Sequence, residues 1–268
     1  MPFDQRGPVG TAPTPIITVQ VPILMYHHVG HGNSYTMSVS LPEFTAQMDW
    51  LKQNGYTSIS IDQIAAALRS EAPLPPRSVA LTFDDGWSYV YTNAVPVMQA
   101  RGFRGTFFVV TNYSGGRSPS YLDWAQIKSL RETGHWIGAH SLSHPNLNLL
   151  NAVVLQREVV SSKAELEKNI GGVVTVFAYP YGANSPRVIQ MVQEAGYVAA
   201  VAVNPRIQQR SDQIYRLNRF NMYSGMTLEQ FQALVTGVPI ALPNAPRLLP
   251  RPNWVPTYRR TARARICD

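Results

Sequence analysis

Cysteine is nearly absent from this chain of 268 residues, which has Cys267 and no other cysteine. An intrachain disulfide is therefore excluded, the redox compartment stays open, and a cysteine-ligated metal cluster is not expected. Long apolar runs are also absent, and no stretch reaches the roughly 20 residues that a transmembrane helix needs. Residues 1–15 lack the charged start and the hydrophobic core of a secretory signal.

Acidic residues are few, with 16 Asp and Glu against 23 Lys and Arg, which gives a formal net charge of +7. Much of this excess lies in a Pro- and Arg-rich tail, residues 239–268, where Asp268 is the single acid. We interpret the tail as a solvated segment, with binding to an acidic partner as the alternative. No recognition-helix pattern supports nucleic-acid binding. The chain thus divides into an N-terminal arm (1–18), a catalytic domain (19–238) and the basic tail.

Internal repeats are absent, and short apolar segments instead alternate with amphipathic ones. Strands are expected near residues 22–26, 56–60, 78–84, 105–111, 135–139, 173–179 and 197–203. Helices are expected near residues 41–54, 62–70, 89–101, 123–133, 149–170, 186–195 and 227–236. Seven such units predict an α/β fold, a distorted (β/α)7 barrel with its helices outside, as a single catalytic domain.

Two adjacent carboxylates, Asp84 and Asp85, end an apolar run that begins at Ser78. By itself this pattern indicates a plain turn at the end of a strand, because Gly86 follows and Asp-Gly is a common turn pair. A second polar cluster, His140 and His144, also follows an apolar run. Parallel α/β folds gather their sites at the carboxyl ends of strands, and an Asp with two His is typical of a catalytic metal site.

A third segment runs from Val176 through Ala178, Tyr179 and Pro180 to Tyr181 and Gly182. Together, Thr82-Phe-Asp-Asp-Gly86, His140-Ser-Leu-Ser-His144 and Phe177-Ala-Tyr-Pro-Tyr-Gly182 resemble the leading motifs of the polysaccharide deacetylases, carbohydrate esterase family 4. That family includes the nodulation chitooligosaccharide deacetylases and deacetylases of peptidoglycan, chitin, acetylxylan and poly-N-acetylglucosamine. The resemblance covers roughly residues 21–234 and implies a distorted seven-stranded barrel.

The resemblance implies a role for each matching residue. Asp84 would be the general base, and Asp85, His140 and His144 would bind a divalent metal ion, most often zinc, with cobalt or nickel as alternatives. The backbone N–H of Tyr181 would stabilise the oxyanion.

The chain departs from the family pattern in three places, one of which is the lack of a tryptophan-containing fourth motif. Ala178 stands where many members have an arginine, and no histidine follows His144. An early segment ending in His27 and His28 instead resembles the poly-N-acetylglucosamine deacetylases, which implies that His27 donates the proton to the leaving amine, with His28 as the alternative. Arg219 either replaces the missing arginine or is an ordinary surface arginine.

These observations predict a metal-dependent hydrolase that removes N-acetyl groups from a glycan containing N-acetylglucosamine. The alternatives are an allantoinase-like hydrolase of a small cyclic amide and a non-catalytic glycan-binding barrel. For each of the aromatic residues near the motifs we expect core packing, with stacking on a sugar ring as the alternative: Trp87, Tyr113, Tyr121, Tyr179 and Tyr181. The family suggests the cell envelope, the periplasm or secretion, but with no visible signal the cytoplasm remains an alternative. The oligomeric state stays open.

Overall fold

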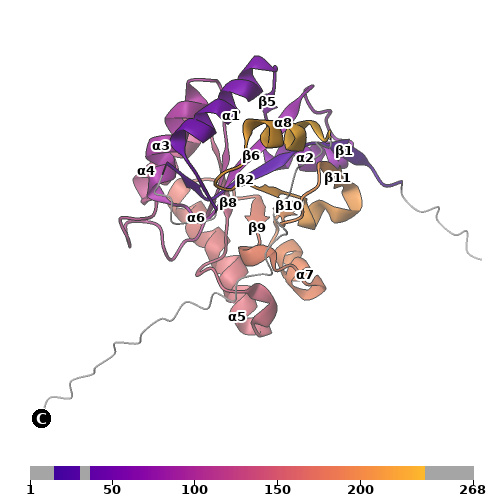
Figure 1. Ribbon diagram of the computed structural model, residues 1–268. Helices are drawn as coiled ribbons and strands as arrows, with labels where there is room; N and C mark the ends of the chain where they lie inside the picture. The colour runs from indigo at the N-terminus through magenta and orange to yellow at the C-terminus, as the bar shows by residue number, and fades with distance from the viewer. Residues whose placement is uncertain (1–14, 31–36, 239–268) are drawn as a thin grey trace, which may run out of the picture. The chain divides into compact units, whose positions relative to one another are not determined.

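The computed structural model describes residues 15–30 and 37–238 (Figure 1). Most of the predicted N-terminal arm and the whole of the predicted basic tail lie outside the described residues. Within these ranges, no helix is both long and apolar enough to cross a membrane.

A parallel sheet forms the centre of the described fold. Its strands are β2 (Ile23–Tyr26), β5 (Thr57–Ser58), β6 (Ser78–Phe83), β7 (Thr106–Val109), β8 (Trp136–Ala139), β9 (Val176–Ala178), β10 (Ala199–Val201) and β12 (Phe220–Asn221). The order is β10-β9-β8-β7-β6-β2-β12, with β5 beside the start of β6, and every pairing is parallel. All six residues of β6 are buried, as expected for a central strand covered on both faces.

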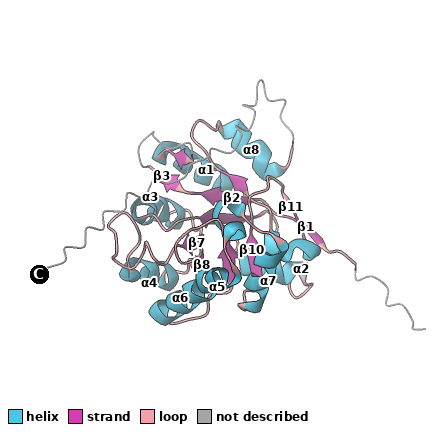
Figure 2. Cartoon of the chain, turned by 90° about the horizontal axis from the view of Figure 1, so that it is seen from below, coloured by secondary structure: helices cyan, strands magenta, loops and turns pink. Residues whose placement is uncertain are grey.

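Helices surround these strands (Figure 2). They are α1 (Leu41–Gln53), α2 (Ile61–Leu68), α3 (Ser88–Gln99), α4 (Trp124–Glu132), α5 (Ala152–Gln156), α6 (Ser162–Ile170), α7 (Pro186–Glu194) and α8 (Leu228–Thr236). Each helix and strand predicted from the sequence is confirmed. The one long helix predicted over residues 149–170 is divided, because a π-helical turn, Arg157–Ser161, joins α5 to α6.

Several elements of two to six residues were not predicted, because they are too short for a periodic pattern. They are β1 (Thr18–Gln20), β3 (His28–Val29), β4 (Ser38–Val39), β11 (Gln208–Arg210), the sheet strand β12 and three 3-10 turns, Leu147–Leu149, Pro180–Gly182 and Ser211–Arg216. β1 pairs antiparallel with β11, and β3 pairs with β4.

Residues 217–221 connect the two ends of the curled sheet. Leu217 forms a parallel bridge with Val201 of β10, and Phe220 pairs with Leu24 of β2. One short segment thus contacts β10 at one end of the sheet and β2 near the other, which produces the predicted α/β barrel in distorted form. Arg219 lies within this closing segment.

Candidate active site

The predicted site residues gather at the carboxyl ends of the parallel strands. His27 follows β2, Asp84 and Asp85 follow β6, and His140 follows β8. Asp85 has a φ of +74°, so the chain turns sharply after β6 and the two carboxylates project differently. Gly86 continues this turn at φ +80°, where a side chain would be strained.

Asp84 is buried and forms a two-pronged ion pair with Arg219. The Oδ1–Nη1 distance is 2.7 Å and the Oδ2–Nη2 distance is 2.8 Å. The guanidinium also donates to the carbonyl of Ala202 and to the hydroxyl of Thr82. Burial raises the pKa of Asp84, but the charge and hydrogen bond of Arg219, together with the nearby His140 and His27, outweigh burial and hold the pKa below its ordinary value. Arg219 is 1% exposed, so the alternative of a surface arginine is wrong.

Asp85, His140 and His144 bring one carboxylate oxygen and two imidazole nitrogens within 4.8 Å of one another. Oδ1 of Asp85 lies 3.5 Å from Nε2 of His140 and 3.4 Å from Nε2 of His144. Ligand atoms bonded at about 2.1 Å to one tetrahedral ion lie about 3.4 Å apart, so this set fits a divalent metal ion. Burial raises the pKa of Asp85, but the neighbouring histidines together have the larger, opposite effect. The pKa is therefore well below its ordinary value, and the carboxylate is ionised.

The orientation of His140 is fixed from behind. Its Nδ1 lies 2.8 Å from the carbonyl oxygen of Ala178, which can only accept, so Nδ1 carries the proton, and the lone pair of Nε2 in the neutral ring would be available to a metal ion. Burial and the nearby His140 lower the pKa of His144 to about 4, which also favours the neutral ring that a metal ion needs.

The structure separates the two early histidines. His27 lies close enough to Asp84 and Asp85 for its charge to lower the pKa of both carboxyls. His28 instead packs on Trp87, with ring centres 4.8 Å apart, and its Nδ1 is hydrogen-bonded to the hydroxyl of Tyr89. The geometry thus favours His27 over His28 as the proton donor, and the role itself stays a prediction.

Tyr181 lies in the 3-10 turn after β9, in the left-handed region at φ +57°. Its ring centre is 4.7 Å from that of His144, and its side chain is 57% exposed. The turn thus places Tyr181 beside the candidate metal site. Tyr179, by contrast, is buried and donates its hydroxyl to the carbonyl of Tyr215, so it offers no surface for stacking.

Comparison with known proteins agrees with this geometry. The family described as polysaccharide deacetylase matches residues 71–200. YxkH of Bacillus subtilis, a protein named after the polysaccharide deacetylases, is 30% identical over 216 residues, which are 81% of this chain and 76% of YxkH. The chain belongs to the polysaccharide deacetylases. These are hydrolases of carbon–nitrogen bonds other than peptide bonds.

Further proteins resemble the chain in sequence or in fold. The poly-beta-1,6-N-acetyl-D-glucosamine N-deacetylase of Staphylococcus aureus is 28% identical over 171 residues, 59% of each protein, so the chain spans little more than half of that relative. The Streptococcus pyogenes deacetylase PplD, solved in complex with acetate, superposes with a TM-score of 0.76 at 25% identity and covers 82% of this chain and 99% of PplD. IcaB from Ammonifex degensii shares the fold, with a TM-score of 0.67 at 24% identity over 81% of this chain and 96% of IcaB.

Trp87 has a contact that the sequence did not reveal. The sequence indicated core packing or a stacking surface for a sugar ring, and the ring of Trp87 packs on that of Tyr121 with centres 4.4 Å apart. Its indole Nε1 also donates to Oδ2 of Asp85 at 3.0 Å, which leaves Oδ1 to face the histidines. A tryptophan two residues after a candidate ligand was the only available signal.

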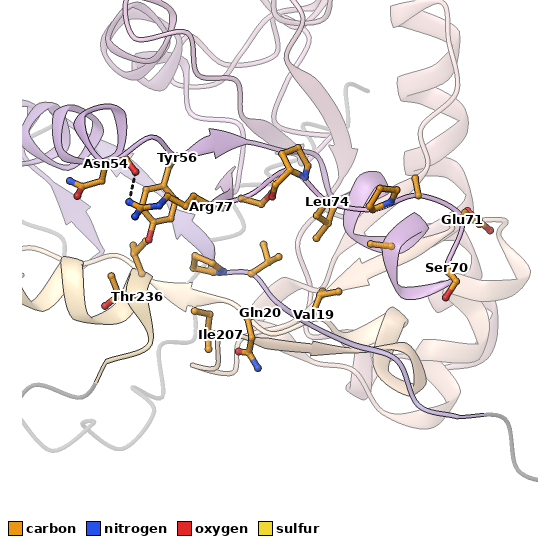
Figure 3. Close-up of a pocket in the computed structure, with 18 of the residues that line it drawn as sticks. Val19, Gln20, Asn54, Tyr56, Ser70, Glu71, Leu74, Arg77, Ile207 and Thr236 are labelled. Carbon is orange, nitrogen blue, oxygen red and sulfur yellow. Dashed lines mark hydrogen bonds between the residues drawn. The ribbon is translucent and has the colours of Figure 1, made fainter.

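A cavity of about 860 Å³ lies away from this cluster (Figure 3). It is lined by residues at the amino ends of the strands, such as Val21, Pro22 and Ser78, and by Arg77, whose guanidinium donates to the carbonyl of Asn54. None of the predicted site residues lines it. The cavity therefore lies at the opposite ends of the strands from the candidate active site.

Proposed function

We propose that residues 19–238 form a metal-dependent N-deacetylase that releases acetate from glycans containing N-acetylglucosamine. The observation that carries the proposal is the juxtaposition of a buried carboxylate, Asp84, with a separate set of metal-ligand type, Asp85, His140 and His144. A distance of 3.9 Å between Oδ2 of Asp84 and Nε2 of His140 links the two. In this assignment Asp84 is not a metal ligand and is available for proton transfer, and Arg219 holds its carboxylate in position.

The reaction requires water to attack the acetamide carbonyl and the C–N bond to break. A divalent ion held by Asp85, His140 and His144 would supply Lewis-acid activation of the water and the carbonyl. Asp84 accepts a proton from the attacking water, and its lowered pKa keeps it in the ionised, basic form. Acetate and a free sugar amine are the products.

Two further groups complete the assignment. His27, beside both carboxylates, donates a proton to the leaving nitrogen, which departs as an amine. The backbone N–H of Tyr181, in the strained turn after β9, stabilises the negative charge that develops on the carbonyl oxygen.

The proposed substrate class rests on a relative of the chain and on the aromatic residues beside the candidate site. The poly-beta-1,6-N-acetyl-D-glucosamine N-deacetylase relative supports a polymer of N-acetylglucosamine. The ring of Tyr121 packs between those of Trp87 and Tyr113, with centres 4.4 and 5.1 Å apart, beside the carboxylate that Trp87 contacts. Aromatic faces of this kind suit the apolar faces of pyranose rings.

The test is release of acetate from β-1,4- and β-1,6-linked N-acetylglucosamine oligomers, with chelated protein before and after addition of zinc, cobalt or nickel. We expect metal-restored release, with β-1,6-linked oligomers preferred. Tight metal binding without acetate from either linkage would replace the glycan with another amide, such as a small cyclic one. Failure to bind any of the three ions would instead favour a non-catalytic glycan-binding barrel.

A further inference from the structure

The loop between the two candidate histidine ligands has an unusual backbone. Ser141 and His144 both lie in the left-handed region, at φ +63° and +57°. Neither is a glycine, and side chains rarely adopt this conformation unless the surroundings enforce it. Within the loop, the N–H of His144 donates to the hydroxyl of Ser141 at 2.9 Å, and contacts from outside the loop hold its other polar groups.

The loop carbonyls bond to the segment that follows β7. The carbonyls of Ser141 and Leu142 accept from the backbone N–H groups of Thr111 and Asn112 at 3.4 and 2.8 Å, and the carbonyl of Ser143 accepts from the hydroxyl of Tyr113 at 3.1 Å. These bonds fix one side of the loop only.

Three hydrogen-bond donors of the loop converge on one buried carboxylate, Glu158. Its Oε2 accepts from the backbone N–H groups of Leu142 at 3.0 Å and Ser143 at 2.8 Å, and its Oε1 accepts from the hydroxyl of Ser143 at 2.7 Å. Glu158 is 2% exposed, and within residues 15–30 and 37–238 no basic side chain forms a salt bridge with it. Successive N–H groups that close on an anion in this way form a tight, directional cradle.

Glu158 reaches the loop from the π-helical turn Arg157–Ser161, between α5 and α6. A π-turn inserts one extra residue into a helix and so changes which side chains face inward, and such turns are frequent at functional sites. The residue after it, Val159, is also buried, but its side chain belongs to the hydrophobic core.

We propose that Glu158 is a positioning residue for the metal site, and that its three hydrogen bonds hold the 141–144 loop so that His140 and His144 share one ion. This inference rests on the metal-binding role proposed above. Partners that orient metal ligands typically change metal affinity by 10- to 100-fold when removed.

The test is zinc affinity, measured by competition with a chromogenic chelator on the whole chain. Glu158→Ala should bind zinc 10- to 100-fold more weakly than the wild type. Glu158→Gln should stay much closer to the wild type, because its amide oxygen can accept from both N–H groups and its NH2 can donate to the hydroxyl of Ser143. The visible spectrum of bound cobalt should change in Glu158→Ala and be preserved in Glu158→Gln.

Val159→Ala is the matched control, since it shortens a buried side chain in the same turn without touching the loop. It should lower the melting temperature of the chelated protein and leave zinc affinity within about twofold. Equal zinc affinity in Glu158→Ala and Val159→Ala would overturn the inference, as would a Glu158→Gln variant no better than Glu158→Ala. Failure of the wild type to bind zinc, cobalt or nickel would remove the proposed metal site itself and is thereby distinguished. Ser143→Ala, which removes one of the three bonds, gives a second reading if Glu158→Ala does not fold.

Discussion

Arg219 and Asp84 are 135 residues apart in the chain, yet their side chains form a buried, two-pronged ion pair at 2.7 and 2.8 Å. The pair links the segment that closes the barrel to the end of the central strand β6. A planar guanidinium fixes both the position and the tilt of the carboxylate, which a lysine cannot do. Arg219 thus has the geometry of a group that aims the proposed base.

Replacement of Arg219 by lysine tests this aiming role. We expect Arg219→Lys to retain the positive charge and the fold but to lower kcat about 100-fold, since a base displaced by about 1 Å loses that much. Zinc content should stay near that of the wild type because Arg219 does not contact Asp85, His140 or His144. Wild-type kcat with an unchanged pH–rate profile would show that the carboxylate is aimed by other contacts.

The two adjacent aspartates should fail in opposite ways. Asp84→Asn removes the proposed base, so kcat should fall about 10²- to 10⁴-fold while the metal content stays near one ion per chain. Asp85→Asn should instead weaken zinc binding, because Asp85 is the only carboxylate in the candidate ligand set. Metal loss in Asp84→Asn together with metal retention in Asp85→Asn would reverse the two assignments.

The sequence predicted the parts of this site that stand next to strong local patterns. Asp84, Asp85 and His140 could be found because each follows a buried strand, where the apolar run ends abruptly. Arg219 remained ambiguous because it precedes β12, a strand of two residues that has no readable period.

Glu158 could not be found from the sequence, and the reason is the local helix geometry. It falls inside a segment that was predicted as one continuous helix, and the π-turn that aims its side chain leaves no signature in the residue pattern. Long-range partners of this kind depend on tertiary packing, which local periodicity does not report.

The early histidines can be distinguished by the leaving group of the substrate. His27→Gln should lower turnover of an N-acetylated sugar strongly, since the amine must be protonated as it departs, with zinc content unchanged. The same variant should hydrolyse 4-nitrophenyl acetate almost normally, because nitrophenolate leaves without a proton. His28→Gln should affect both substrates alike, since His28 contacts Trp87 and Tyr89 rather than the aspartates. A substrate-selective loss in His28→Gln alone would transfer the role to His28.

Trp87 is expected to influence metal affinity through Asp85. Trp87→Phe keeps most of the ring packing against Tyr121 but removes the indole N–H that bonds Oδ2 of Asp85. Zinc affinity should fall about tenfold, because without this hydrogen bond the Asp85 carboxylate can rotate so that Oδ1 no longer faces the two histidines. Trp50→Phe, at a partly buried position of α1 that packs against Phe231 of α8, is the control and should leave the affinity unchanged. Equal zinc affinity in both variants would limit Trp87 to packing or sugar stacking.

His135 should make the stability of the fold depend on pH. It is 2% exposed at the start of β8, its Nδ1 accepts from the N–H of Gly105, and burial lowers its pKa to about 4. The unfolded chain, with a histidine pKa near 6.5, therefore binds more protons than the folded chain between pH 6.5 and 4, so the free energy of unfolding must decrease as the pH falls through that window. The total decrease in the free energy of unfolding is about 3 kcal/mol, at roughly 1.4 kcal/mol per pH unit. No decrease from this histidine is expected above pH 7.

His135→Gln keeps an acceptor for Gly105 and removes the titrating group. Urea unfolding of chelated protein at pH 7.5, 6, 5 and 4.5 should show a shallower decline in the free energy of unfolding for this variant than for the wild type. Parallel curves at all four values would mean that His135 is protonated equally in the folded and unfolded chains, and acid sensitivity would then have to arise from the carboxylates.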